Sequence, residues 1–278
     1  MQPPASDVRR AFGAGGEEPL LLPGGQSRAW RCGDLVLKPV EHEAEHHWVA
    51  AVFSSWPAGD WVRVPVPVAT RSGDLVYDGW AAHHWVDGRD ASMREEPGPI
   101  RRVCEDFHAV IADLERPAFL DERDDPWSFG DRVAWEGQQP QGSTHTLRLI
   151  ESGLAALQPV LSPAQVVHGD IGGNVLIADG LPPAVIDWPP YYRPAGWALA
   201  VAAVDAICWD GAPITLLQEW SDVLDWDQLL LRAVIYRIAT RGRNEALGVN
   251  TQSSEQYLEQ RCPSLQAVLA RLEEGADE

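Results

Sequence analysis

The sequence predicts an α+β protein of two lobes, a β-rich lobe over residues 1–86 and a mostly helical lobe over residues 87–278. In the first part, short apolar runs are separated by Gly, Pro, Ser and Asp, a pattern typical of strands joined by tight turns. From residue 97 onward the apolar residues recur at helical spacing. A chain of 278 residues with 45% hydrophobic residues can also bury the core that such a protein needs.

The composition limits the class of partner. The 41 acidic and 22 basic residues give a net charge of −19, which disfavours nucleic acid and anionic membrane surfaces as partners. No apolar run is long enough to span a bilayer, and residues 1–19 lack the apolar stretch of a signal peptide. Four scattered cysteines without a CxxC pair predict free thiols, so we expect a cytoplasmic protein.

Short strands and one helix are expected along the first lobe. Acidic residues at the start of segment 41–53 favour a helix there. The prolines of segment 61–70 fit an edge strand, and segment 75–86 is predicted to be one strand that leads out of the lobe. The expected strands cover residues 20–22, 29–31, 35–38, 61–70 and 75–86.

A single lysine, Lys38, ends the third predicted strand of a chain that has 21 arginines. An ammonium and a guanidinium are not interchangeable at a tight phosphate contact, so this lysine is a candidate phosphate ligand. Glu45 lies on the same helical face as Trp48 and Val52 and is predicted to point toward the sheet, where a carboxylate needs a partner. We therefore expect Lys38 to pair with Glu45, with Glu41 as the second choice.

The second lobe is predicted to be helical with one irregular stretch. Segment 115–140 mixes prolines, charges and aromatic residues, and we expect an irregular loop there. His108 lies beside the apolar stripe of the first helix and is predicted to be a packed core histidine. The expected helices cover residues 97–114, 147–157, 197–209, 213–220, 225–240 and 254–272.

A hairpin pattern with polar ends interrupts these helices. Residues 165–188 read QVVHGDIGGNVLIADGLPPAVIDW, in which two short apolar runs are joined by an Ala-Asp-Gly turn. A hairpin with this spacing brings Asp170, Asn174 and Asp187 to one end of the structure. Two carboxylates and an amide suit a hard divalent cation such as Mg²⁺, which takes oxygen ligands.

This pattern resembles the catalytic segment of the aminoglycoside phosphotransferase family, small-molecule kinases related to the protein kinases. The resemblance implies a protein-kinase-like fold and transfer of the γ-phosphoryl group of ATP to a hydroxyl of a small molecule. It assigns Asp170 to the acceptor hydroxyl, and Asn174 and Asp187 to Mg²⁺. The family usually has four residues between the Asp and the Asn. Here there are three, Ile171–Gly173, and the two glycines could absorb the shorter path by taking positive φ.

The resemblance also implies that the first lobe binds the nucleotide and the second carries the catalytic and acceptor-binding groups. The loop GGQS at residues 24–27 would hold phosphates through its backbone amides. Lys38, oriented by Glu45, would hold phosphates too, and backbone groups near the end of the fifth strand would hold the adenine. The candidate contacts to ATP are Gly24, Gly25, Ser27, Lys38, Glu45, Trp85, Val86 and Asp87. His168 is expected to be a structural hydrogen-bonding residue of its loop.

The acceptor and two other functions stay open. In the resembling family the C-terminal helices build the acceptor pocket, and an acidic pocket would suit a cationic acceptor such as an amino sugar. Solvated helix faces are the preferred explanation for most of the acidic residues. A pseudokinase-like regulator that binds nucleotide without turnover is favoured by the short Asp170–Asn174 spacing. A zinc hydrolase could use His42 and His46, four residues apart, but no third ligand is evident. The acidic residues in question are Asp205, Asp210, Glu219, Asp222, Asp225 and Asp227.

Overall fold

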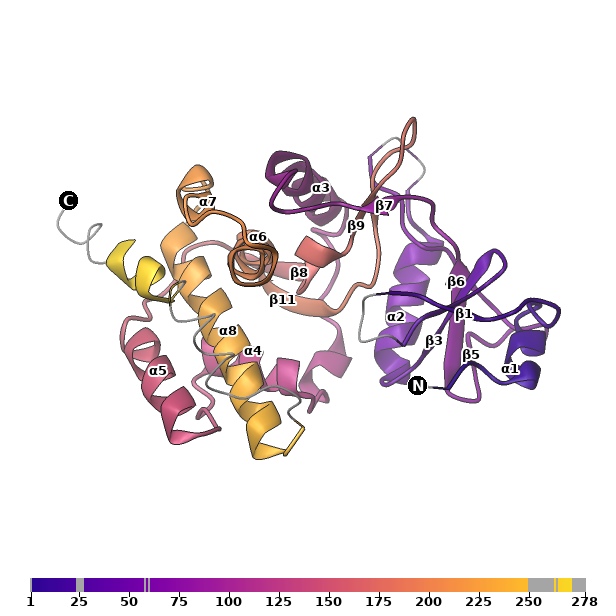
Figure 1. Ribbon diagram of the computed structural model, residues 1–278, viewed down its shortest axis with the longest axis horizontal. Coiled ribbons are helices and arrows are strands. Elements are labelled where there is room, and N and C mark those ends of the chain that lie inside the picture. The colour runs from indigo at the N-terminus through magenta and orange to yellow at the C-terminus, as the bar shows by residue number, and fades with distance from the viewer. Residues whose placement is uncertain are drawn as a thin grey trace. The chain divides into compact units, whose positions relative to one another are not determined.

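The computed structural model describes residues 2–23, 28–57, 59, 61–249, 263 and 265–271. Within it the chain divides into two compact units (Figure 1). The first unit comprises Met1–Asp90 and Val175–Trp188, and the second comprises Ala91–Asn174 and Pro189–Glu278. The predicted lobes, with their boundary between residues 86 and 87, differ from these units mainly in the placement of residues 175–188.

An antiparallel sheet forms the first unit. Its strands lie in the order β1-β2-β3-β6-β4, and β5 pairs with β6. The prolines of segment 61–70 predicted an edge strand, and β4 does lie at the edge of the sheet. The strands are β1 (Leu20–Leu21), β2 (Trp30–Cys32), β3 (Leu35–Pro39), β4 (Pro67–Val68), β5 (Val76–Tyr77) and β6 (Trp80–His84).

The single strand predicted over residues 75–86 is wrong, because the chain turns back at Asp78 and Gly79. These residues have φ of 48° and 72°, and the hairpin that results places Tyr77 opposite Trp80. An Asp-Gly pair between two apolar runs is a strong hairpin signal, since a type I′ turn needs positive φ at both central residues. The sequence therefore contained the information for two strands.

Helix α2 (Glu43–Ser54) packs against Trp188, the residue that follows Asp187. Its buried residues are Ala50 and Phe53, whereas Trp48, on the face predicted to be buried, is half-buried. Trp188 is buried and packs against both aromatic rings, with ring centroids 5.3 Å from Trp48 and 5.5 Å from Phe53. These contacts fix the backbone next to Asp187 within the first unit.

The predicted hairpin over residues 175–186 is confirmed. Strand β9 (Val175–Ile177) pairs with β10 (Ala184–Val185), and β7 (Arg89–Asp90) adds on the other side of β9. The backbone of Arg63 also bonds to the hairpin, donating to Pro183 O at 2.8 Å and accepting from Val185 N at 2.9 Å. Pairing with Arg63 and β7 is the reason that this hairpin belongs to the first unit and not to the helical one.

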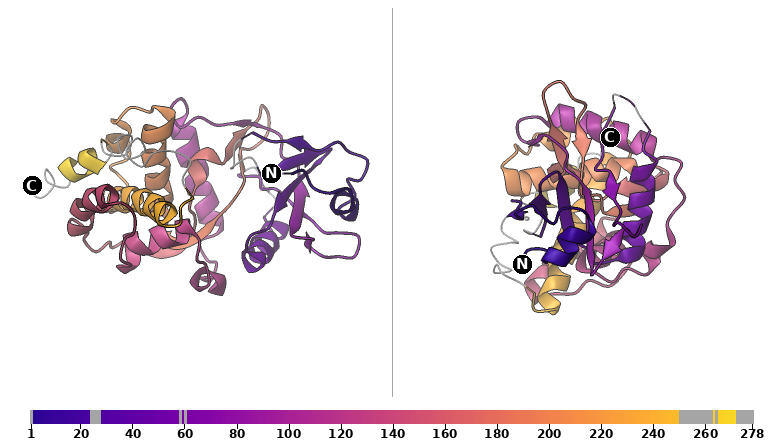
Figure 2. Two further views of the ribbon diagram at one scale, coloured as in Figure 1. Left: turned by 60° about the horizontal axis from the view of Figure 1, so that its bottom comes forward. Right: turned by 90° about the vertical axis from the view of Figure 1, so that its right-hand side faces the viewer.

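The second unit is built around α8 (Trp226–Ala246), which packs against α4, α5 and α6 (Figure 1). Figure 2 shows α8 running beside α5. A two-stranded sheet of β8 (Ala164–His168) and β11 (Pro190–Pro194) lies next to α6. The other helices are α3 (Pro97–Val110), α4 (Pro126–Glu136), α5 (Thr144–Ala155), α6 (Ala195–Asp205) and α7 (Leu216–Glu219). The helix predicted over 254–272 falls mostly outside the described residues, of which 265–271 are helical.

The irregular loop predicted over residues 115–140 is wrong, because it contains α4. The Asp125 carboxylate caps this helix by accepting from the N–H groups of Trp127 and Ser128, each at 2.9 Å. Pro126 occupies the first helical position and Gly137, with φ of 73°, ends the helix. Asp-Pro at the start and Gly at the end are regular helix boundaries that can be read from sequence.

Gly130 allows α4 and α8 to pack closely. A Cβ at this position would lie 2.3 Å from Thr240 Oγ1 and 2.6 Å from the carbonyl oxygen of Tyr236. Because the backbone oxygen cannot rotate away, we expect Gly130→Ala to lower the free energy of unfolding by about 1–3 kcal/mol, measured by urea denaturation. Gly98→Ala, in α3 with no neighbour within 4 Å, is the control and should leave stability equal or slightly higher. Equal losses in both variants would contradict the tight crossing.

Two further features concern the described residues alone. Cys32, Cys104 and Cys208 are free thiols, and Cys262 falls outside this set. Among the helices described, none has both the length and the apolar character needed to cross a membrane.

Candidate active site

In the first unit, Lys38 pairs with the carboxylate of Asp187, at the end of the β9–β10 hairpin. Lys38 Nζ on β3 lies 2.7 Å from Asp187 Oδ1, just after β10. The structure therefore brings together two of the predicted site residues, which are far apart in the sequence. A fixed ammonium beside a half-exposed carboxylate provides one group for phosphate oxygens and one for a cation bound to them.

The backbone of Asp187 is in the left-handed region, with φ of 50°. A non-glycine residue there costs about 1–2 kcal/mol and persists only where its surroundings hold it. Here the buried ring of Trp188 and the ion pair to Lys38 supply those surroundings. Aspartate and asparagine tolerate this conformation better than other residues that have a Cβ. The carboxylate of this left-handed residue lies beside Lys38.

Glu45 is half-buried on α2 and Glu43 is exposed, as the helical periodicity predicted, whereas Glu41, predicted on the same face as Glu45, is exposed. Glu41 pairs with Arg28, so the second-choice partner of Lys38 is engaged elsewhere. The predicted contact between Glu45 and Lys38 stays a prediction.

His83 of β6 contributes no positive charge beside Lys38. Burial first, and then the nearby Lys38 charge, lower the pKa of His83 to about 4. At neutral pH the imidazole is therefore uncharged, and Lys38 supplies the cation on this part of the sheet. Of the two histidines in the zinc alternative, His46 has its pKa lowered chiefly by burial. Within the described ranges, no three His, Cys, Asp or Glu residues form a group suited to a metal ion.

The predicted adenine segment follows β6. The N–H of Trp85 donates to Asp34 O at 2.8 Å, and the carbonyl oxygen of Asp87 accepts from Arg63 Nη2 at 2.9 Å. Val86 keeps its backbone N–H and C=O without a hydrogen-bond partner in the described part of the chain. Val86 is therefore the predicted adenine contact whose backbone groups are best placed to bond a ligand. The phosphate-loop candidates Gly24, Gly25 and Ser27 lie outside the described residues.

In the second unit, the loop that carries Asp170 is closed by its own polar groups. The N–H of Asp170 donates to Nδ1 of buried His168 at 3.1 Å, and Asn174 Nδ2 donates to Asp170 O at 2.6 Å. His168 is thus a structural hydrogen-bonding residue, as predicted. Because its amide nitrogen is engaged, Asn174 turns its Oδ1 away from this bond, and a carboxamide oxygen in that state fits the ligand set of Mg²⁺.

The shorter path from Asp170 to Asn174 is a 3₁₀ turn, Ile171–Gly173. The expectation that its glycines take positive φ is wrong, since neither Gly172 nor Gly173 does so. Gly172 is needed for close packing instead, because a Cβ there would lie 3.0 Å from the Cβ of Ala202 on α6. The tighter turn thus accommodates three residues without unusual backbone angles.

Sequence reasoning missed Arg237, which contacts the Asp170 carboxylate directly. Arg237 Nη2 lies 2.5 Å from Asp170 Oδ1, and its Nε lies 3.1 Å and 3.0 Å from the two oxygens of Asp205. Burial alone would lower the pKa of Arg237, but the charges of Asp205 and Asp170 raise it well above its ordinary value. An arginine inside the apolar run of α8 was the available signal, because a buried cation needs a carboxylate partner.

The family of the chain follows from a comparison with known protein families. The profile of the phosphotransferase enzyme family matches residues 22–200, well over half of the chain. The chain belongs to the phosphotransferase enzyme family. This membership confirms the predicted resemblance and the prediction that the protein is a small-molecule kinase. A search of curated proteins finds no match.

Solved structures confirm the predicted α+β, protein-kinase-like fold of this phosphotransferase. Choline kinase LicA from Streptococcus pneumoniae is 10% identical with a TM-score of 0.60, over 95% of this chain and 98% of that one. A choline/ethanolamine kinase family protein from Mesorhizobium loti is 17% identical with a TM-score of 0.59, over 95% and 94%. Spectinomycin phosphotransferase APH(9)-Ia, in complex with ADP and spectinomycin, is 12% identical with a TM-score of 0.53, over 91% and 92%.

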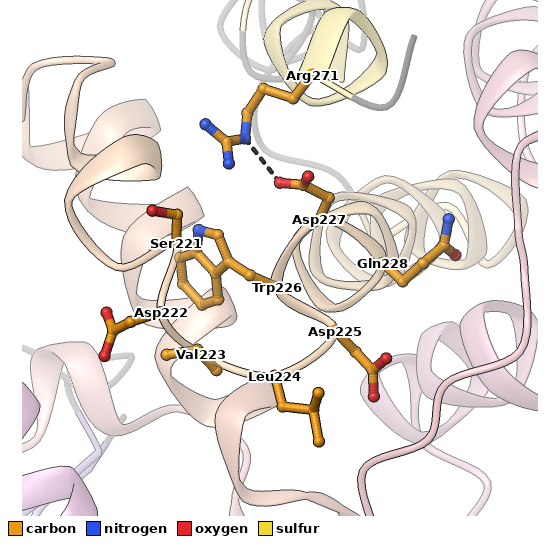
Figure 3. Close-up of a pocket in the computed structure, with 9 residues that line it drawn as sticks. All are labelled: Ser221, Asp222, Val223, Leu224, Asp225, Trp226, Asp227, Gln228 and Arg271. Carbon is orange, nitrogen blue, oxygen red and sulfur yellow. Dashed lines mark hydrogen bonds and ion pairs between the residues drawn. The ribbon is translucent and has the colours of Figure 1, made fainter. Parts of the chain in front are cut away.

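Acidic residues of the C-terminal helices of the phosphotransferase mostly have partners within the second unit. Asp222, Asp225 and Asp227 line a pocket of about 480 Å³ together with Arg271. Asp227 points to Arg271, whose Nε lies 2.7 Å from Asp227 Oδ1 (Figure 3). Asp222 pairs with Arg101 at 2.5 Å. Asp225 accepts from the N–H groups of Leu161 and Ser162 and from the Ser162 hydroxyl. These contacts account for the three carboxylates without an acceptor.

His108 on α3 supports the end of β8, next to the loop that carries Asp170. Its Nδ1 donates to Cys104 O at 2.6 Å, and its Nε2 accepts from the N–H of His168 at 3.0 Å. The tautomer follows from the backbone N–H of His168, which can only donate. Burial lowers the pKa of His108 to about 4, so the ring is neutral at neutral pH, and the predicted core histidine is confirmed.

We expect His108 to make stability depend on pH. The unfolded chain binds this proton near pH 6.5 and the folded protein only near pH 4, so its contribution is complete above pH 6.5 and is lost as the pH falls toward 4. The interval corresponds to about 3 kcal/mol. Urea unfolding between pH 7 and pH 4.5 should show a steeper fall for the unaltered protein than for His108→Gln. His145→Gln, on an exposed side chain of α5, should keep the full slope. A His108→Gln curve as steep as the unaltered one would contradict this assignment.

Proposed function

We propose that the protein transfers the γ-phosphoryl group of ATP to a hydroxyl of a small molecule, with Mg²⁺ as the metal cofactor. The observation that supports this most directly is the ion pair of Lys38 and Asp187, at 2.7 Å. It joins the single lysine of the chain to a carboxylate held in a strained backbone conformation. A triphosphate that binds with a divalent cation needs one group of each kind.

The residues divide the work as follows. Lys38 places its ammonium against phosphate oxygens, and Glu45 orients it from α2. Asp187 and Asn174 would hold Mg²⁺, which supplies charge neutralisation on the transferring phosphoryl group. Asp170 orients the acceptor hydroxyl and takes its proton. Rate enhancement comes mainly from positioning and electrostatic stabilisation, because phosphoryl transfer leaves little covalent chemistry to the protein.

Gly24, Gly25 and Ser27 complete the nucleotide site in this proposal, through backbone amides that donate to phosphate oxygens. Trp85, Val86 and Asp87 hold the adenine edge, and Val86 offers both a donor and an acceptor. We propose the cytoplasm as the location of the reaction, because ATP is the common phosphoryl donor there and the free thiols Cys32 and Cys104 stay reduced.

For the acceptor we propose a small alcohol, with cationic amino sugars, aminoglycosides and amino alcohols as the first class to test. Similar structures contain spectinomycin or hygromycin B, or belong to choline and ethanolamine kinases. Those acceptors share a hydroxyl group and a nitrogen that is positively charged at neutral pH. The net charge of −19 attracts cations in general and is compatible with this class.

The test uses the full chain with ATP and Mg²⁺ against a panel of aminoglycosides, amino sugars, choline-like alcohols and neutral sugars. Mass spectrometry detects a phosphorylated acceptor directly, and Asp170→Asn is the matched inactive control. A phosphorylated product that Asp170→Asn does not form supports the proposal. A thermal shift with Mg²⁺ and ATP but no product from any acceptor favours the pseudokinase-like regulator. If the protein neither binds nucleotide nor transfers a phosphoryl group, both the kinase and the pseudokinase-like regulator are contradicted.

A further inference from the structure

Arg237 connects the proposed acceptor-orienting carboxylate to the helical core of the second unit. It lies in the middle of α8, and Asp205 is the last residue of α6, against which α8 packs. The guanidinium donates to the Asp205 carboxylate through Nε and Nη2. The same Nη2 also donates to Asp170 Oδ1 at 2.5 Å. Asp170 itself lies in a loop, so this arginine ties a loop carboxylate to two packed helices.

The exposed fraction of the three side chains rises from Arg237 through Asp205 to Asp170. Arg237 is 11% exposed, Asp205 is 19% exposed and Asp170 is 50% exposed. The planar donors of the guanidinium contact Asp205 at two points, which holds the guanidinium in place, and one of them also fixes the position of Asp170 Oδ1. With Oδ1 held by Arg237, no donor of the described residues reaches Oδ2 of Asp170, so this oxygen is the one left for an acceptor hydroxyl.

We propose that Arg237, anchored by Asp205, is a positioning residue for phosphoryl transfer, which fixes the Asp170 carboxylate so that Oδ2 meets the acceptor hydroxyl. The inference rests on the proposed function. Arg237 acts through Asp170 and touches neither nucleotide nor acceptor in this scheme. Loss of Arg237 therefore affects the transfer step and leaves nucleotide binding in the first unit in place.

The second unit contains a matched control, because Arg193 also bridges two carboxylates. Arg193 Nε lies 2.9 Å from Asp131 Oδ1, and its Nη2 lies 2.6 Å from both Asp131 Oδ2 and Glu136 Oε1. Arg193, Asp131 and Glu136 are 17%, 10% and 47% exposed, close to the values of the Arg237 group. Removal of either arginine breaks a similar ion-pair group, but only Arg237 contacts Asp170.

The experiment measures kcat, KM for ATP and the melting temperature, with the acceptor that the panel identifies. Arg237→Gln should lower kcat by about 10- to 100-fold with little change in KM for ATP, since small misplacements of a reacting group cost rate rather than binding. Arg193→Gln should lower the melting temperature to a similar degree and keep kcat within about two-fold. Arg237→Lys should have a kcat between those of Arg237→Gln and the unaltered protein, because an ammonium retains the charge but cannot contact Asp205 and Asp170 in the same planar geometry.

A cycle with Asp170→Asn separates positioning from general damage. If Arg237 acts through Asp170, then Arg237→Gln should cause little further loss of kcat once Asp170 is replaced. A full further loss, or equal kcat losses in Arg237→Gln and Arg193→Gln, would overturn the inference. Should Arg237→Gln fail to fold, the double variant Arg237→Gln, Asp205→Asn removes both buried charges and should show the same loss of kcat.

Failure of this inference is distinguishable from failure of the proposed function. If the unaltered protein transfers no phosphoryl group to any acceptor, the proposed function falls and this inference falls with it. If the unaltered protein transfers and Arg237→Gln keeps its kcat, only the positioning role of Arg237 is lost.

Discussion

Asp170→Asn is expected to lower kcat by about 10²- to 10⁴-fold, the range that general acid–base groups contribute. Asparagine has nearly the same shape, its Oδ1 can still accept from Arg237, and its backbone can still bond His168 and Asn174. What it loses is the ability to take the proton of the acceptor hydroxyl. The affinity for ATP with Mg²⁺ should stay within a few-fold, measured by calorimetry or nucleotide fluorescence.

Asp179→Asn is the control for this substitution. Asp179 lies in the turn between β9 and β10 with an exposed side chain, and its replacement removes the same charge from the same part of the sequence. We expect its kcat to match the unaltered protein. If Asp170→Asn retains more than about a tenth of the activity, proton transfer to Asp170 cannot be an essential part of the mechanism.

The local parts of the fold and site could be predicted from sequence. The hairpin that ends in Asp187 follows from two apolar runs and one turn, and the structural role of His168 was predicted together with the family resemblance. Two local signals were available and not used. Asp125-Pro126 marks the start of α4, and Asp78-Gly79 marks the turn between β5 and β6.

The contacts that were missed connect residues that are far apart in the sequence. The pair of Arg237 and Asp170 spans 67 positions, and no spacing rule relates α8 to the loop after β8. The predicted bond of Lys38 to Glu45 of the next helix stays a prediction, made because helical periodicity identifies neighbours along one element. The observed contact of Lys38 with Asp187 depends on where β10 ends relative to β3, which follows from the packing of the hairpin against the first unit.

Lys38→Arg tests whether the single lysine of a chain with 21 arginines is needed as an ammonium. We expect kcat/KM for ATP to fall by about 10²-fold or more, comparable with the removal of one donor to a developing charge. A guanidinium can still pair with Asp187, so the melting temperature should change little. The loss arises because a bulkier, planar cation cannot occupy the tight phosphate contact of an ammonium.

The reverse exchange, Arg71→Lys, is the control, because Arg71 is exposed in the turn after β4 and should tolerate lysine without a change in kcat/KM. Comparison of Lys38→Arg with Lys38→Met then separates charge from shape. If charge alone matters, arginine rescues what methionine loses; if the compact ammonium matters, both variants fail at the nucleotide step. Full activity in Lys38→Arg would mean that Lys38 serves Asp187 as a structural counterion, and another cation would then have to hold the triphosphate.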